Sequence, residues 1–375
     1  MKKCVIITGT HWNRPSDAAT FPAWNFYREL KHRMNFEIWA EGIETGTFQN
    51  LHPLKASEPE TNRKGIRFAY FALGGKSTKS QFSSELVKSC ESADLILLCY
   101  RGGTDLVDFV VRNWGTKTLL HPTDNFLLAN LRSGSYREAA KSLLEQIHYN
   151  LLPLTNIIFV SEADRRFFTY LFPWHKSKAH AVPLGVDIVS FCPSERKKSN
   201  QSNIFKLLFT GDLSYPPNDK ACAYILQHIL PKLPLHVTIT FAGRRPPDFL
   251  IQASGADSRI NVTGYVDDIS QYYQESDAFV APIFQGAGMQ NKLLEASACG
   301  LPCITSSVCA KAFRIIPPNF MIADKPQQYI DHINRLTTST ELLTDIGRLG
   351  RNHIINSYSW LNRAVKLLDI AGFQA

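Results

Sequence analysis

The chain is 375 residues long, which is too long for one typical hydrophobic core and predicts two domains of ordinary size. Hydrophobic residues make up 44% and charged residues 20%, a balance that excludes a disordered chain. Residues 1–185 hold 23 Lys and Arg against 17 Asp and Glu, so most of the net charge of +8 lies in the first half. A basic excess suits anionic partners such as a bilayer surface, and the alternative is that it serves solubility alone.

The sequence also limits where the protein acts and what it binds. The apolar run before Gly9 is shorter than the roughly 7–15 residues of a signal peptide, and no apolar stretch reaches the roughly 18 residues of a membrane span. Eight cysteines without a CxxC pair predict buried thiols in a reducing compartment, with neither disulfides nor zinc. No zinc-finger or RNP-type pattern supports nucleic acid as a partner. We expect a cytoplasmic protein, peripheral on the inner face of the membrane.

In the first half, short aliphatic runs alternate with helical patterns, which is typical of parallel α/β units. The predicted strands are Lys3–Thr8, Phe36–Ala40, Ile66–Phe71, Leu95–Tyr100, Thr118–His121 and Ile157–Ser161. The predicted helices are Pro22–His32, Gln81–Cys90, Leu106–Asn113, Tyr136–Leu151 and Glu162–Leu171. The segment AVPLGVD at 181–187 and the polar stretch 194–203 after it predict a domain boundary, so the first domain covers residues 1–185.

The same alternation continues in a second predicted domain, residues 186–355. Its predicted strands are Lys206–Thr210, Val237–Ala242, Asn261–Thr263, Ala278–Pro282 and Pro302–Thr305. Its predicted helices are Asn218–Leu230, Ile269–Glu275, Gln290–Cys299 and Gln327–Thr337. The tail Glu341–Ile370 keeps a helical period, and we expect residues 356–375 to form a C-terminal helix that crosses back to the first domain.

The sharpest local signal is QGAGMQNKLLEASACGLP at residues 285–302. A predicted strand ends before it, a turn with Gly286 and Gly288 follows, and a helix begins after the turn. Free backbone N–H groups and the helix dipole favour a phosphate in such a turn, and Lys292 adds a positive charge. Glu295 lies on the same helical face, placed to accept hydrogen bonds from ribose hydroxyls. The alternative is an ordinary helix-surface pair of Lys292 and Glu295 beside a simple turn.

Four motifs of the second half together resemble the donor-binding domain of GT-B glycosyltransferases, particularly glycosyltransferase family 4 of bacterial polysaccharide and glycolipid synthesis. They are FTGDLSYPPN at 209–218, TFAG at 240–243, GYVDDISQYYQESDAFVAP at 264–282 and QNKLLEASACGLP at 290–302. VPLGVD at 182–187 is similar to the family's interdomain strand. The resemblance implies an α/β protein of GT-B architecture, with two Rossmann-like domains whose parallel sheets face a central cleft.

The resemblance also implies an activity, a hexosyltransferase that moves a sugar from a nucleotide diphosphate-sugar to a saccharide or lipid-linked acceptor with retention of configuration. It assigns Lys292 to the diphosphate and Glu295 to the nucleotide ribose. Many members carry another glutamate eight positions earlier, where this chain has Ala287, so the positioning of the sugar stays open. The candidate donor-binding residues are Gly211, Arg244, Gly286, Gly288, Gln290, Asn291, Lys292 and Glu295.

No metal or other cofactor is expected. The pair Asp267 and Asp268 invites a metal interpretation, because many sugar transferases hold a divalent ion with paired aspartates. Here the pair precedes a predicted helix at Ile269, which favours a capping role. Lys292, helix amides and Arg244 or Arg245 would then stabilise the leaving diphosphate.

Candidate acceptor residues follow two predicted strands of the first domain. The segment GTHWNR begins at Gly9, the expected turn residue of a cleft loop that also carries His11 and Arg14. Arg14 meets a phosphate or is a free surface arginine. After the fifth strand, Asp124 is the candidate to orient or deprotonate the acceptor hydroxyl, and His121 is the second candidate. The alternative for Asp124 is a helix N-cap.

Two other functions fit the same architecture. A nucleotide-sugar epimerase would need no separate acceptor. A nucleotide-sugar-binding protein that has lost turnover is suggested by Ala287, because the first of the family's two glutamates is missing there.

Overall fold

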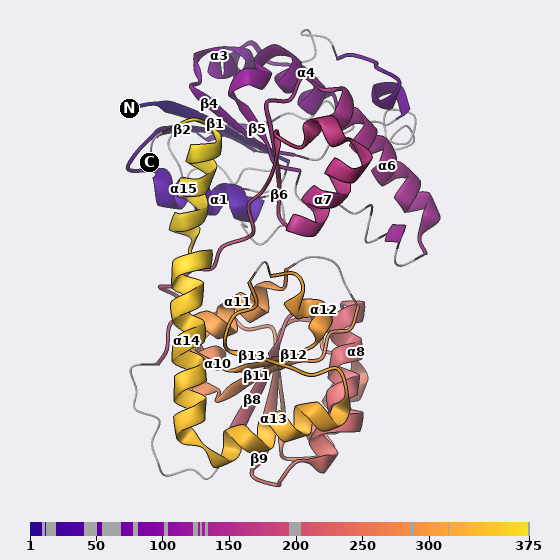
Figure 1. Cartoon of the computed structure of the whole chain (residues 1–375), viewed down its shortest axis with the longest axis vertical. Helices are drawn as coiled ribbons and strands as arrows, with labels where there is room; N and C mark the ends of the chain where they lie inside the picture. The colour runs from indigo at the N-terminus through magenta and orange to yellow at the C-terminus, as the bar shows by residue number, and fades with distance from the viewer. Residues whose placement is uncertain are drawn as a thin grey trace. The chain divides into compact units, whose positions relative to one another are not determined.

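The computed structural model of the chain describes residues 1–9, 12, 20–40, 51–54, 69–77, 82–100, 104–122, 127, 130–131, 134–194, 204–285, 289–313 and 315–373. The chain forms two compact units, each an α/β layer structure (Figure 1). Unit 1 comprises Met1–Leu184 and Trp360–Ala375, and unit 2 comprises Gly185–Ser359. The last helix therefore belongs to the same unit as the N-terminus.

Unit 1 is built on a seven-stranded parallel sheet of order β3-β2-β1-β4-β5-β6-β7. Its central strands are continuous apolar runs such as LILLC in β4, as expected where both faces of a parallel sheet are covered. Thr8 lies opposite Cys99 in the register, so β1 and β4 end together. The strands are β1 (Lys3–Thr8), β2 (Asn35–Ala40), β3 (Leu51–Pro53), β4 (Leu95–Cys99), β5 (Thr118–Leu120), β6 (Asn156–Phe159) and β7 (Ala179–Ala181).

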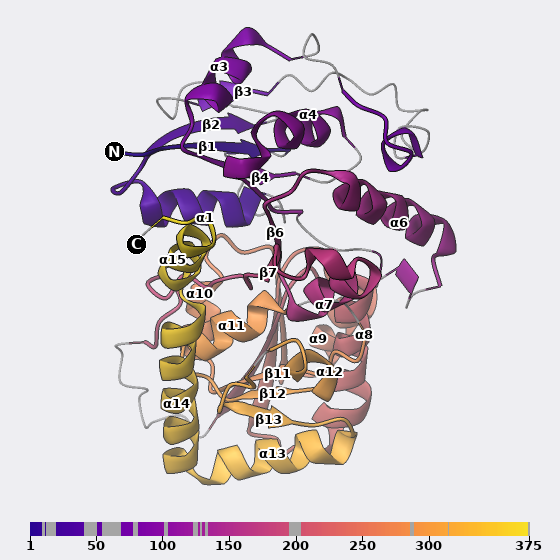
Figure 2. The same ribbon diagram turned by 45° about the horizontal axis from the view of Figure 1, so that its top comes forward.

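Helices cover both faces of this sheet. On one face α1 (Thr20–Leu30) packs beside α15 (Trp360–Ile370) (Figure 2). The ring of Phe26 meets that of Trp360 edge to face. The other helices of unit 1 are α3 (Ser84–Ser92), α4 (Asp105–Trp114), α6 (Tyr136–Leu151) and α7 (Glu162–Leu171). Side-chain hydroxyls of Ser83, Thr104 and Ser161 cap α3, α4 and α7, which explains where these helices begin.

Unit 2 repeats the design with a six-stranded parallel sheet of order β10-β9-β8-β11-β12-β13. The strand order reverses between β8 and β11, and such a switch point opens a crevice at the carboxyl ends of the strands. The strands are β8 (Phe205–Thr210), β9 (Val237–Ala242), β10 (Ile260–Gly264), β11 (Ala278–Ala281), β12 (Cys303–Thr305) and β13 (Phe320–Ile322).

The long helix α14 fixes the position of α11 in unit 2. Gly347 of α14 lies so close to the chain after α11 that a Cβ there would stand 2.0 Å from the carbonyl oxygen of Gly300. Arg351 of α14 donates to the carbonyls of Phe191 and Ala298. The helices of unit 2 are α8 (Pro216–Tyr224), α9 (Asp248–Ala256), α10 (Ser270–Glu275), α11 (Asn291–Ala298), α12 (Ser307–Ala310), α13 (Pro326–Thr338) and α14 (Thr340–Tyr358).

Most predicted elements are present within a few residues of their expected bounds, but one strand was wrong. Residues 69–72 are helical, whereas Ile66–Phe71 was predicted as a strand; 66–68 lie outside the described residues. The apolar residues of this segment suggested a buried strand, whereas Phe71 is buried as part of a helix and its ring stacks on that of His148. The prediction also missed the three-residue strands β3, β7 and β13 and the four-residue helix α12, which are too short to show a period, as well as the nine-residue helix α9.

The structure also describes the eight cysteines and the hydropathy of the helices. All eight cysteines are free thiols, and all but Cys192 are buried. Burial raises the pKa of the Cys4, Cys90 and Cys222 thiols to about 12, which makes them poor nucleophiles. In the part of the chain that the structure describes, no helix is both long enough and apolar enough to cross a bilayer.

Candidate functional site

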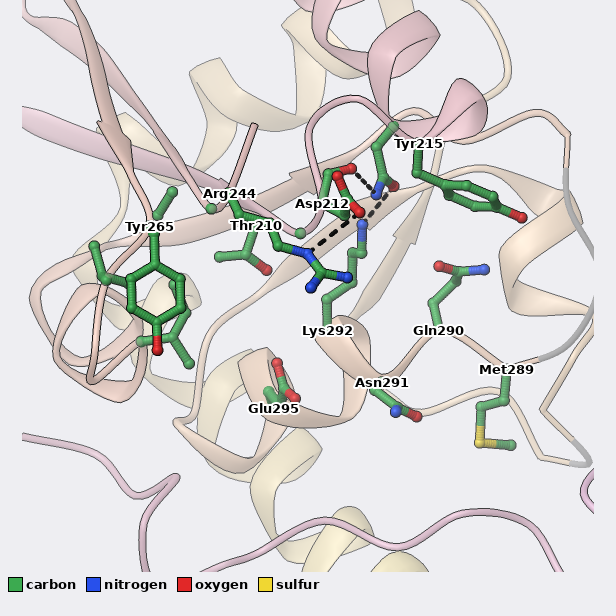
Figure 3. Close-up of a pocket in the computed structure, with 16 residues that line it drawn as sticks. Thr210, Asp212, Tyr215, Arg244, Tyr265, Met289, Gln290, Asn291, Lys292 and Glu295 are labelled. Atoms are coloured by element: carbon green, nitrogen blue, oxygen red, sulfur yellow. Dashed lines mark hydrogen bonds and ion pairs between the residues drawn. The ribbon is translucent and has the colours of Figure 1, made fainter. Parts of the chain in front are cut away.

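A cavity of about 500 Å³ opens at the carboxyl ends of β8 and β9 in unit 2. Loops after three neighbouring strands and the first turns of α11 form its wall, and most of its polar side chains point inward (Figure 3). The lining residues are Thr210, Gly211, Asp212, Tyr215, Asn218, Ala242, Gly243, Arg244, Tyr265, Val266, Ile269, Met289, Gln290, Asn291, Lys292 and Glu295. This is the position that the switch point of the sheet predicts for a ligand.

Two glycines allow the floor of this cavity to form. Gly211 and Gly243 have φ angles of +143° and +150°, which L side chains rarely adopt. A Cβ on Gly243 would stand 1.7 Å from the carbonyl oxygen of Gly211, so the loops after β8 and β9 touch through their backbones. A Cβ on Gly211 would stand 2.9 Å from Nζ of Lys292. Glycine at both positions therefore leaves room for a ligand and for the lysine.

Lys292 is fixed in the first turn of α11 with its ammonium group in the cavity. The side chain of Lys292 is drawn in Figure 3, where a dashed line joins its Nζ to the amide of Asn218. Its Nζ donates to Oδ1 of Asn218 at 2.6 Å and lies 4.6 Å from the ring centroid of Phe209. Burial lowers the pKa of Lys292 to about 8. An anion bound here would raise this pKa again, because an opposite charge nearby favours the charged form. Asn291 adds a buried Oδ1 with no hydrogen-bond partner in the described part of the chain.

Glu295 lies one turn further along α11 and is held by a chain of hydroxyls. Tyr273 donates its hydroxyl to Oε2 of Glu295 at 2.8 Å, and Thr210 Oγ1 is 2.6 Å from the same tyrosine oxygen. Because a carboxylate only accepts, the phenol donates to Glu295 and the Thr210 hydroxyl donates to the phenol. Burial raises the pKa of Glu295, and the Tyr273 hydrogen bond and the Lys292 charge oppose that rise.

Two arginines stand at the mouth of the cavity and share one carboxylate. Arg244 Nε lies 3.3 Å from Asp212 Oδ2, and Arg245 pairs with the same group through Nε and Nη2. The hydrogen bond from Arg245 lowers the pKa of Asp212, so this carboxylate is charged. Arg245 has a φ of +56°, in the left-handed region that a non-glycine residue seldom occupies. The mouth thus holds two exposed guanidinium groups beside Lys292.

Six of the predicted donor-binding residues line this one cavity: Gly211, Arg244, Gln290, Asn291, Lys292 and Glu295. Gly286 and Gly288 lie outside the described residues. Sequence reasoning missed Asn218, Tyr273 and Asp212 as functional neighbours. Their signals were present in the motifs FTGDLSYPPN and GYVDDISQYYQ, but a buried tyrosine in a helix has the same pattern as ordinary core.

Unit 1 places two predicted residues at strand ends. Gly9 follows β1, and a Cβ there would clash with the Tyr100 ring at 2.6 Å. His121 follows β5 and is 1% exposed, and burial lowers its pKa to about 4, so its imidazole is neutral. Nδ1 of His121, Oγ1 of Thr8 and Nε1 of Trp12 are buried and have no hydrogen-bond partner in the described parts of the chain. The predicted residues His11, Arg14 and Asp124 lie outside those parts.

The described residues contain no cluster of three or more His, Cys, Asp or Glu side chains that could hold a metal ion. Asp268 Oδ1 accepts from the backbone N of Ser270, the first residue of α10, at 2.9 Å and from its hydroxyl at 2.6 Å. These bonds tie Asp268 to the start of α10, but the N-cap residue is Ile269, which makes no side-chain cap hydrogen bond, so the capping role stays a prediction. The absence of an essential metal stays a prediction.

Two α/β units, each built on a parallel sheet, are typical of the GT-B fold class, and here the second unit has a cavity at its switch point. The crystal structure of HepE from Anabaena in complex with UDP and glucose matches with a TM-score of 0.67 and 14% identity, over 99% of this chain and 100% of that one. Residues 204–339 match the family described as "Glycosyl transferases group 1". This match lies within unit 2, and the predicted α/β fold class of GT-B architecture is confirmed.

Two curated relatives extend the comparison. "Spore coat protein SA" of Bacillus subtilis (strain 168) is 26% identical over 244 residues, which are 58% of this chain and 64% of the relative. The "UDP-Gal:alpha-D-GlcNAc-diphosphoundecaprenol alpha-1,3-galactosyltransferase" of Escherichia coli is 24% identical over 217 residues, 52% of this chain and 54% of the relative. The matched region thus spans less than two thirds of the length of either relative.

Proposed function

We propose that this protein transfers a sugar from a nucleoside diphosphate-sugar, held in the cavity of unit 2, to a saccharide or lipid-linked acceptor. The observation that carries this proposal is the arrangement on α11. Lys292 and Glu295 line one cavity at one turn's spacing, as a diphosphate and a ribose would require. The name of the E. coli relative, a galactosyltransferase with a diphosphoundecaprenol acceptor, and the complex of HepE with UDP support the same chemistry.

In the proposed reaction the acceptor oxygen forms a bond to the anomeric carbon while the bond from that carbon to the diphosphate oxygen breaks. The leaving diphosphate gains negative charge in the transition state, where Lys292, Arg244 and the free N–H groups of α11 would stabilise it. Glu295 accepts hydrogen bonds from ribose hydroxyls and so orients the nucleotide. No metal or other cofactor takes part, and the configuration of the sugar is retained.

The acceptor hydroxyl must lose a proton in this reaction. Asp124 is the proposed group that takes it or orients the hydroxyl, and His121 is the second candidate. A neutral His121 imidazole has an unprotonated ring nitrogen and can accept a proton or a hydrogen bond. A front-face mechanism would instead let the leaving phosphate take the proton.

We propose further that the protein works in the cytoplasm at the inner face of the membrane and binds anionic bilayers reversibly. The basic excess of residues 1–185 supports this partner. Raising the salt concentration should release the protein, because surface charges are screened within about 10 Å at 0.1 M ionic strength. Equal sedimentation with neutral and anionic vesicles would contradict the proposal.

One observation favours a second candidate. Ala287 occupies the position where many family members carry a glutamate, which is compatible with a protein that binds nucleotide sugars without turning them over. An epimerase of the same architecture would convert the donor with no acceptor present.

A screen over UDP-, GDP- and ADP-sugars tests the proposal. A donor at one hundred times its Kd should stabilise the fold by about 2.7 kcal/mol, which a thermal-shift assay detects. The donor that binds is then incubated with soluble and lipid-linked sugar acceptors. A new glycoside supports the proposal. An interconverted sugar nucleotide indicates the epimerase, and binding without any product indicates the non-catalytic protein.

A further inference from the structure

One surface of unit 1 gathers exposed aromatic rings and lysines within a short stretch of chain. It is formed by the end of α7 and by the 3-10 turn Pro173–His175 that follows. Tyr170 and Trp174 are 80% and 65% exposed, and Lys176 and Lys178 are exposed next to them in the sequence. We call these four residues the α7 surface.

The indole of Trp174 is fixed in place although it is exposed. Its Nε1 donates to Oδ1 of Asn150, in the last turn of α6, at 2.7 Å. Its ring meets that of Phe172 edge to face, with centroids 5.9 Å apart. Beneath it, buried His175 has its Nε2 3.3 Å from the carbonyl oxygen of Asn150. A ring held this way loses little conformational freedom when it binds a partner, so its apolar area is available at low entropic cost.

The charged residues of this stretch of chain all have one sign. Between residues 165 and 186 the sequence has four Lys and Arg and no Asp or Glu. Arg165 and Arg166 both pair with Glu162 one turn earlier, at 2.6 and 3.1 Å. Lys176 and Lys178 form no ion pair with any residue that the structure describes. Two uncompensated ammonium groups therefore accompany the two aromatic side chains.

We propose that the α7 surface is where this protein binds an anionic bilayer. Trp and Tyr favour the boundary between headgroups and acyl chains, since their rings are apolar and their N–H and O–H groups stay hydrogen-bonded. Lysines near an anionic leaflet strengthen binding roughly fivefold each. The inference rests on the membrane partner proposed above and not on the transfer chemistry.

The α7 surface and the predicted acceptor residues lie at opposite ends of the strands of unit 1. The carbonyl of Lys178 accepts from the backbone N of Ile157, near the start of β6, so the α7 surface lies at the amino ends of β6 and β7. Gly9 and His121 follow the carboxyl ends of β1 and β5, at the opposite edge of the same parallel sheet. A bilayer bound at the α7 surface would not cover the strand ends where the acceptor residues were predicted.

Vesicle sedimentation of the full chain tests the charges. The vesicles contain phosphatidylcholine mixed with phosphatidylglycerol, or phosphatidylcholine alone. The double variant Lys176→Gln, Lys178→Gln should bind the anionic vesicles roughly 25-fold more weakly than wild type. The matched control is Lys206→Gln, Lys232→Gln, which removes the same charge from two exposed lysines of unit 2 and should bind nearly as wild type. Equal losses in both double variants would overturn the assignment, because net charge alone would then explain binding.

Fluorescence tests the aromatic contact in wild type, with no requirement that a variant fold. Trp12, Trp39 and Trp360 are buried, and Trp24 and Trp114 are partly buried, so a bilayer-bound chain should expose chiefly Trp174 to quenching by brominated lipid. Trp174→Phe should remove most of the quenching while the protein still sediments. Binding to anionic vesicles without quenching of Trp174 would overturn the proposal. A wild-type dimer that the lysine variants dissociate would overturn it as well, in favour of a second copy as partner.

The nucleotide-sugar thermal shift, run on the same preparations, keeps the two proposals apart. The α7 variants should retain the wild-type shift. A protein that binds vesicles through this surface but binds no nucleotide sugar would contradict the proposed activity and leave the membrane surface standing.

Discussion

The two units carry polar groups at the ends of their parallel strands, but they satisfy them differently. In unit 2, Lys292, Glu295 and Asp212 each have a hydrogen-bonded or charged partner beside one cavity. In unit 1, Thr8 and His121 end their strands with buried polar atoms that have no partner in the described ranges. The comparison indicates that the donor chemistry is preorganised within unit 2, whereas the acceptor chemistry of unit 1 is not complete in the residues described.

The largest expected effect tests unit 1. Asp124→Asn should leave donor binding unchanged and reduce sugar transfer by about 10²–10⁴-fold if Asp124 acts as a general base. Titration calorimetry with the nucleotide sugar and a product assay on the same preparation measure both quantities. A smaller loss would indicate orientation in place of proton transfer. Transfer at the wild-type rate would show that the assignment is wrong and would make His121 the next candidate.

Lys292→Ala tests the preorganised side. Losing a charge-assisted contact to the diphosphate costs about 1.5–3 kcal/mol, so donor affinity should fall roughly 10- to 150-fold while the fold is kept. Lys220→Ala is the matched control, because Lys220 is exposed in the same unit and donates to Gln285 outside the cavity lining. Calorimetry measures the affinity and circular dichroism the fold. A folded Lys292→Ala protein with wild-type affinity and turnover would refute the diphosphate role.

The low pKa of Lys292 predicts a pH dependence on the alkaline side. A lysine with a pKa of about 8 is charged below that value and becomes neutral as the pH rises through it. Donor affinity should therefore fall roughly tenfold between about pH 7 and 9 if the diphosphate needs the ammonium group. Lys292→Arg keeps its charge over this range, so its affinity should not decline. Equal slopes for the two proteins would place the titrating group elsewhere.

The smallest expected effect concerns the hydroxyl chain. Tyr273→Phe removes the donor to Glu295 and should weaken donor binding by about two- to tenfold. Because the charged form of Glu295 loses a hydrogen bond, the pKa of Glu295 should rise further. As the pH is lowered, the variant should therefore begin to lose donor affinity at a higher pH than wild type does. Tyr272→Phe removes the neighbouring hydroxyl and serves as control. If donor affinity falls at the same acidic pH in Tyr273→Phe as in wild type, the Tyr273 hydroxyl does not stabilise the charged form of Glu295.

The sequence predicted unit 2 better than unit 1 for physical reasons. Apolar strands such as Val237–Ala242 end at glycines, which mark a turn because they readily adopt a positive φ, so the strand, the turn and the following helix could be placed together. Lys292 and Glu295 were found because a helix start imposes both a dipole and a spacing. Tyr273 was missed, since no local pattern separates a tyrosine that donates to a buried carboxylate from one that merely packs.

In unit 1 the failures lie where long-range contacts decide. Phe71 was assigned to a predicted strand, but residues 69–72 are helical and the Phe71 ring stacks on His148, a residue far away in the sequence. The three-residue strands β3 and β7 pair at the sheet edges, where neighbours determine pairing more than sequence does.

The contact between Gly347 and Gly300 has a consequence for laboratory evolution of this protein. Any side chain at Gly347 would push α14 away from the chain after α11, and α11 carries Lys292 and Glu295. In a selection for altered donor specificity, Gly347 should tolerate substitution as poorly as the cavity residues, although it does not line the cavity. Libraries that diversify Gln290, Tyr265 or Met289 while leaving this glycine pair intact should retain the largest fraction of folded members.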